Sequence, residues 1–136
     1  MKKTFPFLLL AAAALLGQSC KQAKDSFIEG VLEKEAREFN KTGGKMVDKE
    51  TRLDSLGVKP GKCLVYYYTS LNYAKGDLDS IALKKNLRPT IRKAIATRED
   101  MVTLRQQEVS FEYTYYDKNG QYWFVIPIRP KDYQKK

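Results

Sequence analysis

The sequence contains no histidine, and this absence argues against several classes of enzyme. Serine and cysteine hydrolases that use an imidazole as general base need at least one histidine, and so do most zinc sites. A glycine-rich phosphate loop is also missing, because the segment KTGGK lacks the spacing of a P-loop and has no strand before it. We therefore expect a protein that is not an enzyme and has no catalytic residue, metal or cofactor.

Cysteines and long apolar runs are also scarce. Only Cys20 and Cys63 are present, and Cys63 lies among strand-forming residues in KCLVYYYTS. This setting predicts a buried structural thiol, since no histidine can activate it as a nucleophile. The longest apolar run, from Phe5 to Leu16, has about 12 residues, whereas a membrane-spanning helix needs about 20. A permanent transmembrane helix is therefore disfavoured.

The N-terminal segment has the order of a secretory signal peptide. Lys2 and Lys3 precede the apolar run, and small or polar residues follow it. A buried first helix is the alternative, but Ala and Leu on every face argue against it. We therefore predict a signal peptide at residues 1–19, a lipidated cysteine and short tether at 20–26, and a single domain at 27–136.

The residues around Cys20 indicate where the exported protein is located. Gly17, Gln18 and Ser19 followed by a cysteine resemble the lipobox of bacterial lipoproteins, in a loose form that lacks the usual aliphatic residue. The resemblance implies that signal peptidase II cuts before Cys20 and that Cys20 carries acyl chains. Cleavage by ordinary signal peptidase, with Cys20 unmodified, is the alternative. Because Lys21 rather than aspartate follows, we expect a Gram-negative outer-membrane lipoprotein that faces the periplasm or the cell surface.

The chain is strongly basic, with a formal net charge of +9. Removal of residues 1–19 would leave 23 basic and 16 acidic side chains, a net charge of +7. The densest basic group comprises Lys84, Lys85, Arg88, Arg92 and Lys93. A solvated helix face explains such a group, and so does attraction to phospholipid, lipopolysaccharide phosphate or acidic glycan. Nucleic acid is not expected as a partner, because no recognition motif accompanies the charge.

Periodicity and turn residues predict an α+β fold: an antiparallel sheet of about four strands with helices on one face, in the order α-β-β-α-β-β. Within the long helical segment, Pro89 predicts a break or a new start, and Thr97 with Asp100 predicts a capping box. Asp117 to Gly120 predict a hairpin turn with a glycine bulge, and Pro127 predicts an edge strand. The predicted ranges are helix 25–40, strands 46–56 and 62–73, helical pieces within 79–107, and a hairpin of strands 109–116 and 121–128.

The segments TRLDS, PGK and YYYT, the LRPTI helix and the YTYYDKNG hairpin together resemble a group of small exported bacterial proteins of unknown function. The resemblance covers about residues 46–133 and implies no activity. Some members of that group have cysteines at places where this sequence has other residues. The resemblance therefore implies no stapling disulfide.

Nine tyrosines and one tryptophan suggest a binding surface or a packed sheet. Cross-strand pairing is the commoner role of such residues, but one aromatic set is expected to face solvent. We predict a lipid-anchored cell-envelope protein, a non-enzymatic binding or scaffolding module, with an inhibitor or immunity-type protein against an envelope hydrolase as the alternative. Its expected partners are the membrane, through acyl chains on Cys20, and an envelope protein or an anionic glycan or lipid. The candidate binding surface comprises Tyr66, Tyr68, Tyr116, Trp123, Arg88, Arg92 and Lys93.

Overall fold

The computed structural model describes the backbone of residues 5–134 and the side chains of residues 20–134. Among these residues, no helix combines the length and the apolar character needed to cross a membrane. The side chains of the predicted signal peptide, residues 1–19, lie outside the described residues. In chain order the elements are α1 (Phe5–Asn40), β1 (Lys45–Met46), β2 (Thr51–Lys59), β3 (Cys63–Ser70), α2 (Ser80–Thr97), the 3-10 helix η1 (Glu99–Met101), α3 (Val102–Gln106), β4 (Ser110–Tyr116), β5 (Tyr122–Ile128) and α4 (Pro130–Tyr133).

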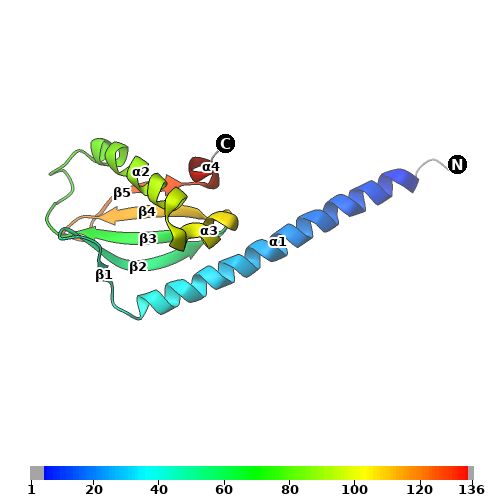
Figure 1. Cartoon of the computed structure of the whole chain (residues 1–136), viewed down its shortest axis with the longest axis horizontal. Coiled ribbons are helices and arrows are strands. Elements are labelled where there is room, and N and C mark those ends of the chain that lie inside the picture. Colours follow the sequence, from blue (N-terminus) through cyan, green and yellow to red (C-terminus); the bar gives the residue numbers. More distant parts are fainter. Residues whose placement is uncertain (1–4, 135–136) are drawn as a thin grey trace.

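The α+β class is confirmed, and the sheet has five strands in the order β1-β2-β3-β4-β5 (Figure 1). Three of its four pairings are antiparallel, but β3 and β4 are parallel, which the prediction of an antiparallel sheet missed. The physical reason is the connection between them. The segment containing α2 and α3 crosses the sheet, and such a crossover returns the chain in the original direction.

The central strand β3 has apolar side chains on both of its faces. Leu64, Tyr66 and Tyr68 alternate with Cys63 and Val65, as expected for a strand in the middle of a sheet. The first set belongs to the face on which α2 lies, because Leu64 shares a buried cluster with Ile95 of α2. Cys63 is only 9% exposed, and burial raises the pKa of its thiol. The predicted burial of Cys63 is therefore confirmed.

Helix α1 lies against the sheet through part of its length (Figure 1). Leu32 and Ala36 are buried, and Ile28 packs against the main core, a spacing of four residues that forms one stripe. The predicted end at Asn40 is confirmed, but the helix begins before Asp25 and runs through the predicted tether at 20–26. Phe27 and Val31 lie outside this stripe and are 70% and 44% exposed.

Polar contacts attach α1 to the interior of β2 and to the turn after it. The Asn40 side chain donates to the Leu56 carbonyl at 2.9 Å and accepts from the Leu56 N–H at 2.8 Å. At the turn, the Glu29 carboxylate accepts from the backbone N–H groups of Gly61 and Lys62 at 2.8 and 3.0 Å. The helix therefore binds the part of β2 that does not pair with β1, and the turn that follows the strand.

Helix α2 is continuous through Pro89, so the predicted break is wrong. Proline removes the hydrogen bond to the carbonyl four residues earlier, but Pro89 and Lys85 are both exposed and that carbonyl lies on the solvent side. The predicted capping box is also wrong. Thr97 donates to the Lys93 carbonyl at 2.8 Å, and Asp100 forms an ion pair with Arg98 at 2.6 Å.

The C-terminal hairpin is confirmed. Strands β4 and β5 pair antiparallel, and the Gly120 N–H donates to the Asp117 carbonyl at 3.0 Å to close the turn. Gly120 has a φ of +77°, the left-handed conformation that favours glycine. Strand β5 lies at the sheet edge, as Pro127 predicts.

Candidate functional site

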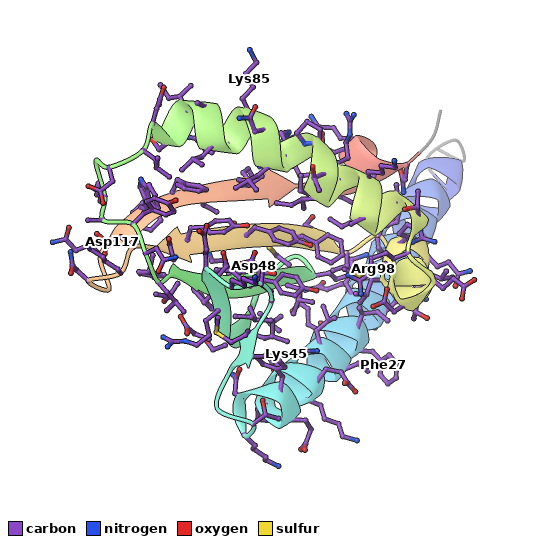
Figure 2. The ribbon with its side chains drawn as sticks, turned by 60° about the vertical axis from the view of Figure 1, so that its left-hand side comes forward. Phe27, Lys45, Asp48, Lys85, Arg98 and Asp117 are labelled. Carbon is purple, nitrogen blue, oxygen red and sulfur yellow. The ribbon has the colours of Figure 1, made fainter. Side chains whose placement is uncertain are left out.

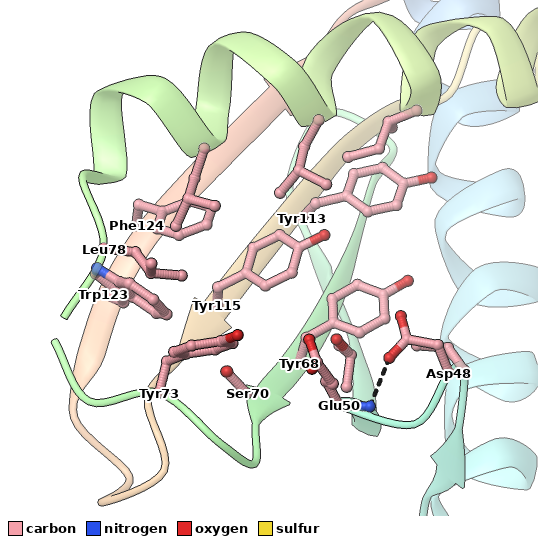
Figure 3. Close-up of a pocket in the computed structure, with 15 residues that line it drawn as sticks. Asp48, Glu50, Tyr68, Ser70, Tyr73, Leu78, Tyr113, Tyr115, Trp123 and Phe124 are labelled. Atoms are coloured by element: carbon pink, nitrogen blue, oxygen red, sulfur yellow. Dashed lines mark hydrogen bonds between the residues drawn. The ribbon is translucent and has the colours of Figure 1, made fainter.

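The candidate site is a cavity of about 410 Å³ between α2, the sheet and the turn that joins β1 to β2 (Figure 3). We call it the α2 cavity. Its volume is in the range of pockets that take small molecules or large side chains. Its lining comprises Val47, Asp48, Glu50, Thr51, Tyr68, Ser70, Tyr73, Leu78, Leu83, Leu87, Ile91, Tyr113, Tyr115, Trp123 and Phe124.

The helical wall of the α2 cavity is aliphatic. Leu83, Leu87 and Ile91 are spaced four residues apart and therefore form one stripe on α2. Asp79 begins the helix by accepting a hydrogen bond from the Ile81 N–H at 2.8 Å. The first leucine of the stripe is therefore held at a capped helix start.

The sheet wall is a ladder of aromatic rings from three strands. The ring centroids of Tyr68 and Tyr115 are 5.1 Å apart, and those of Tyr115 and Phe124 are 4.7 Å apart. Tyr68 also stacks on Tyr113 at 6.1 Å, and Tyr113 stacks on Tyr66 at 4.9 Å. These offset rings give the cavity a firm, apolar floor.

The tyrosine hydroxyls of the ladder keep their protons at neutral pH. Burial raises the pKa of Tyr66 and of Tyr115 to about 12, and the nearby Asp48 carboxylate adds to the effect at Tyr115. Burial also raises the pKa of Tyr68 and of Tyr113 above its ordinary value of 10. Neutral hydroxyls can donate and accept hydrogen bonds, but at neutral pH they provide no charged group for catalysis.

The rim of the cavity is both apolar and acidic. Val47 and Leu78 are 49% and 37% exposed, so two aliphatic side chains border the opening. Asp48 and Glu50 belong to the turn between β1 and β2, which is stabilised by the Glu50 N–H donating to Asp48 at 2.8 Å (Figure 3). Cations are therefore favoured at the rim and apolar groups inside.

Asp117 organises the loops at the end of the cavity. Its side chain is buried and accepts hydrogen bonds from the N–H groups of Lys75, Asn119 and Gln121 at 2.8, 2.9 and 2.8 Å. These hydrogen bonds, led by that from Lys75, lower the pKa of the carboxyl. The loop that carries Tyr73 is thereby joined to the β4–β5 hairpin, and the Lys118 N–H adds a bond to the Tyr73 carbonyl at 3.0 Å.

The four aromatic residues predicted to form a solvent-facing set do not share one open face. Tyr68 and Trp123 line the α2 cavity, and Trp123 is only 8% exposed. Tyr66 lies on the same face of the sheet, stacked on Tyr113. Tyr116 instead meets Tyr67 on the other face, with ring centroids 6.5 Å apart. The sheet therefore separates Tyr116 from the other three residues.

The basic residues of the predicted surface lie on α2 but differ in their surroundings. Arg88 donates to the Pro127 carbonyl at 2.6 Å and pairs with Asp132 at 3.2 Å. Arg92 and Lys93 are exposed. Arg88 thus holds α2 against β5 and α4, while the other two face solvent. Cys20, the predicted lipidation site, is exposed on α1 and forms no disulfide.

Sequence reasoning did not identify the α2 cavity itself. The stripe of Leu83, Leu87 and Ile91 is visible as periodicity, but the same pattern describes ordinary packing of a helix on a sheet. Val47 and Asp48 had been placed within a strand, and nothing in the sequence indicates that they line the same cavity as Leu78. This arrangement depends on the parallel pairing of β3 and β4, which sets the position of α2.

Three solved structures share this fold. A Pseudomonas aeruginosa protein described as secreted is 14% identical, with a TM-score of 0.63, and the match covers 82% of this chain and 96% of that one. The pilotin of the Vibrio vulnificus type 2 secretion system is 13% identical, with a TM-score of 0.61 and coverage of 85% and 99%. The type II secretion system pilotin of Vibrio cholerae is 11% identical, with a TM-score of 0.60 and coverage of 82% and 96%.

At such low identity the likeness establishes the fold alone, and that fold occurs in small proteins of bacterial secretion systems. No curated protein sequence matches the chain. Residues 28–124, from the packed part of α1 to β5, match the family described as "Domain of unknown function (DUF8479)", and the chain therefore belongs to that family.

Proposed function

We propose that the protein is a lipid-anchored, non-enzymatic binding module of the bacterial cell envelope that holds an apolar segment of a partner protein in the α2 cavity. The observation that carries the proposal is the cavity itself. An aliphatic stripe and an aromatic ladder enclose about 410 Å³, and the exposed side chains of Val47 and Leu78 border the opening. Apolar side chains gathered at the mouth of an apolar pocket are typical of a binding site.

The rim determines which apolar segment fits best. Asp48 and Glu50 both line the cavity, and no basic side chain is among the lining residues. A partner with a lysine or arginine next to its aliphatic or aromatic side chains would complement this charge. The preferred ligand is therefore an apolar peptide segment with a basic flank.

The likeness to two pilotins supports an envelope role, since both belong to bacterial secretion systems. The position of Cys20 supports an anchor. It is exposed on α1, five residues before Asp25, whose carboxylate pairs with Lys62 at 3.1 Å at the start of β3. Acyl chains on Cys20 would therefore attach beside the β2–β3 turn, while the β1–β2 turn at the cavity mouth lies at the other end of β2.

Site-specific photocrosslinking tests the cavity. A photoreactive amino acid at Val47, on the rim, should give one discrete crosslinked protein in envelope fractions, whereas the same group at Ile81 should crosslink no protein. Ile81 is the matched control because it is 73% exposed and does not line the cavity. Mass spectrometry of the crosslinked peptide should identify an apolar segment with a basic flank. Equal products from both positions, or an acidic peptide, would contradict the proposal.

The Cys20→Ser variant tests the anchor separately. If Cys20 is acylated, the variant should lose the mass of the acyl chains and should not be cut by signal peptidase II. Mass spectrometry and membrane fractionation measure both effects. A variant with the same processing, apart from the Ser substitution, and the same membrane retention would show that Cys20 carries no anchor. That result would leave the cavity proposal intact.

The inhibitor alternative has less support from this geometry. A carboxylate on a projecting loop would be the natural inhibitory group, and the β4–β5 turn is such a loop. However, its Asp117 is 1% exposed and accepts three backbone hydrogen bonds. This side chain is therefore committed to the fold.

A further inference from the structure

The outer face of α2 carries a concentration of unpaired positive charge. The 18-residue helix contains no acidic side chain. Within the described part of the chain, Lys85, Arg92 and Lys93 are exposed and form no ion pair, and neither does Lys84 at the edge of this face. Figure 2 shows Lys85 directed away from the sheet. We call Lys85, Arg92 and Lys93 the basic face.

Contacts on the opposite side of α2 keep the basic face turned outward. Leu83, Leu87 and Ile91 line the α2 cavity. Arg88 fixes the helix through its 2.6 Å hydrogen bond to the Pro127 carbonyl and its ion pair with Asp132. The helix cannot rotate to bury its cations without giving up these contacts.

An exposed apolar side chain lies beside these charges. Ile81, in the first turn of α2, is 73% exposed, the highest value among the exposed large apolar residues in the described part of the chain. Because 81, 85 and 92 are separated by four and seven residues, all three lie on one side of the helix. Basic side chains flanking an isoleucine on a convex helix match the boundary between lipid headgroups and acyl chains.

We propose that the outer face of α2 binds anionic lipid headgroups at a bilayer surface. The basic face attracts phosphate groups, and Ile81 enters the headgroup region. A flat surface with mobile anions can meet flexible lysines on a convex helix, whereas the α2 cavity on the other side of the helix stays open for a protein partner. The proposal does not depend on acylation of Cys20.

A fluorescent label on α2 tests this contact in the full chain. Ala82→Cys in a Cys20→Ser background places an environment-sensitive fluorophore on the exposed outer side of α2, while Cys63 stays buried. Residues 5–16 can enter any bilayer, but a label at position 82 responds only to contact of α2. Fluorescence should rise with phosphatidylglycerol-containing vesicles and not with pure phosphatidylcholine vesicles. Added salt should reduce the response.

The variant Lys85→Gln/Arg92→Gln/Lys93→Gln should raise the lipid concentration for half-maximal response about fivefold per charge removed, on the order of 100-fold in all. The control Lys34→Gln/Lys45→Gln/Lys118→Gln removes the same charge from exposed positions outside α2 and should change it little. Ile81→Ser, with all charges intact, should also weaken the response. Circular dichroism checks that every variant is folded.

Three results would overturn the proposal. One is an equal loss of response in both triple variants, which would mean that only the net charge matters. Another is an equal response from a label placed at Asn119 in the β4–β5 turn. The third is displacement of the protein from vesicles by polyglutamate at equal charge concentration, which would show that the basic face prefers an acidic polypeptide.

Discussion

At the scale of single residues, Asp117 shows how one buried carboxylate can hold two distant loops together. It accepts N–H groups from Lys75, 42 residues earlier in the chain, and from Asn119 and Gln121 in its own turn. The turn pattern DKNG predicts the hairpin but not the bond to Lys75. The sequence predicts the hydrogen bonds within the turn because they join residues that are close in the chain. It does not predict the bond from Lys75, which depends on the tertiary structure.

We predict that Asp117→Asn lowers the free energy of unfolding at neutral pH. We also expect the variant to lose less stability than the unaltered protein when the pH falls from 7 to 3. Because hydrogen bonds lower the pKa of Asp117 below its ordinary value of 3.8, its stabilising effect is present above about pH 4 and is lost as the pH falls through the folded-state value. Urea unfolding at pH 7 and at pH 3 measures both effects. Asn119→Ala is the control, since only its backbone N–H is used. An unchanged difference between the two pH values in Asp117→Asn would refute the assignment.

At the scale of elements, the sequence predicted where helices and strands lie better than how they meet. The β4–β5 hairpin and the end of α1 at Asn40 were correctly predicted, because both depend on local periodicity and capping. Pro89 was misread as a break, since a proline is tolerated where the freed carbonyl faces water. The role of Asn40 was missed because its partner, Leu56, is 16 residues away.

The Asn40 side chain acts as a short substitute for a neighbouring strand. It donates to the carbonyl of Leu56 and accepts from its N–H at the edge of β2, and it therefore helps to cover an edge that could pair with another chain. We predict that Asn40→Ala lowers the free energy of unfolding by about 1–2 kcal/mol, since two exposed hydrogen bonds are lost. Asn40→Asp keeps the acceptor but not the donor. Its free energy of unfolding should lie between those of the unaltered protein and Asn40→Ala. Equal stability of all three proteins in urea would show that the contact adds nothing.

At the scale of the whole molecule, aromatic side chains make up much of the hydrophobic core. The composition suggested a sheet rich in tyrosine, and this is confirmed. The composition did not indicate which rings face α2, because successive side chains of β3 point to opposite faces of the sheet and both sets are apolar. The crossover through α2 covers one of these faces and thereby distinguishes them. Tyr66 and Tyr68 thereby lie under or beside the helix, and Tyr67 lies on the other face with Tyr116.

This arrangement predicts unfolding in alkali. Burial raises the pKa of Tyr66, Tyr115 and Tyr133 to about 12, and it also raises the pKa of Tyr68 and of Tyr113. A raised folded-state pKa stabilises the protein fully below the unfolded-state value near 10, and this contribution is lost as the pH rises from 10 through about 12.

The fold should therefore be lost cooperatively in this interval, with absorbance of tyrosinate at 295 nm rising together with the loss of circular dichroism. Tyr113→Phe removes one buried hydroxyl and should shift the midpoint of unfolding to higher pH. The reason is that one fewer tyrosine keeps its proton in the folded state and releases it on unfolding. Tyr122→Phe, which alters a half-exposed residue outside the ladder, is the matched control and should leave the midpoint unchanged. If the absorbance rises fully while the circular dichroism is still native, the ladder is open to solvent and does not form the floor of the α2 cavity.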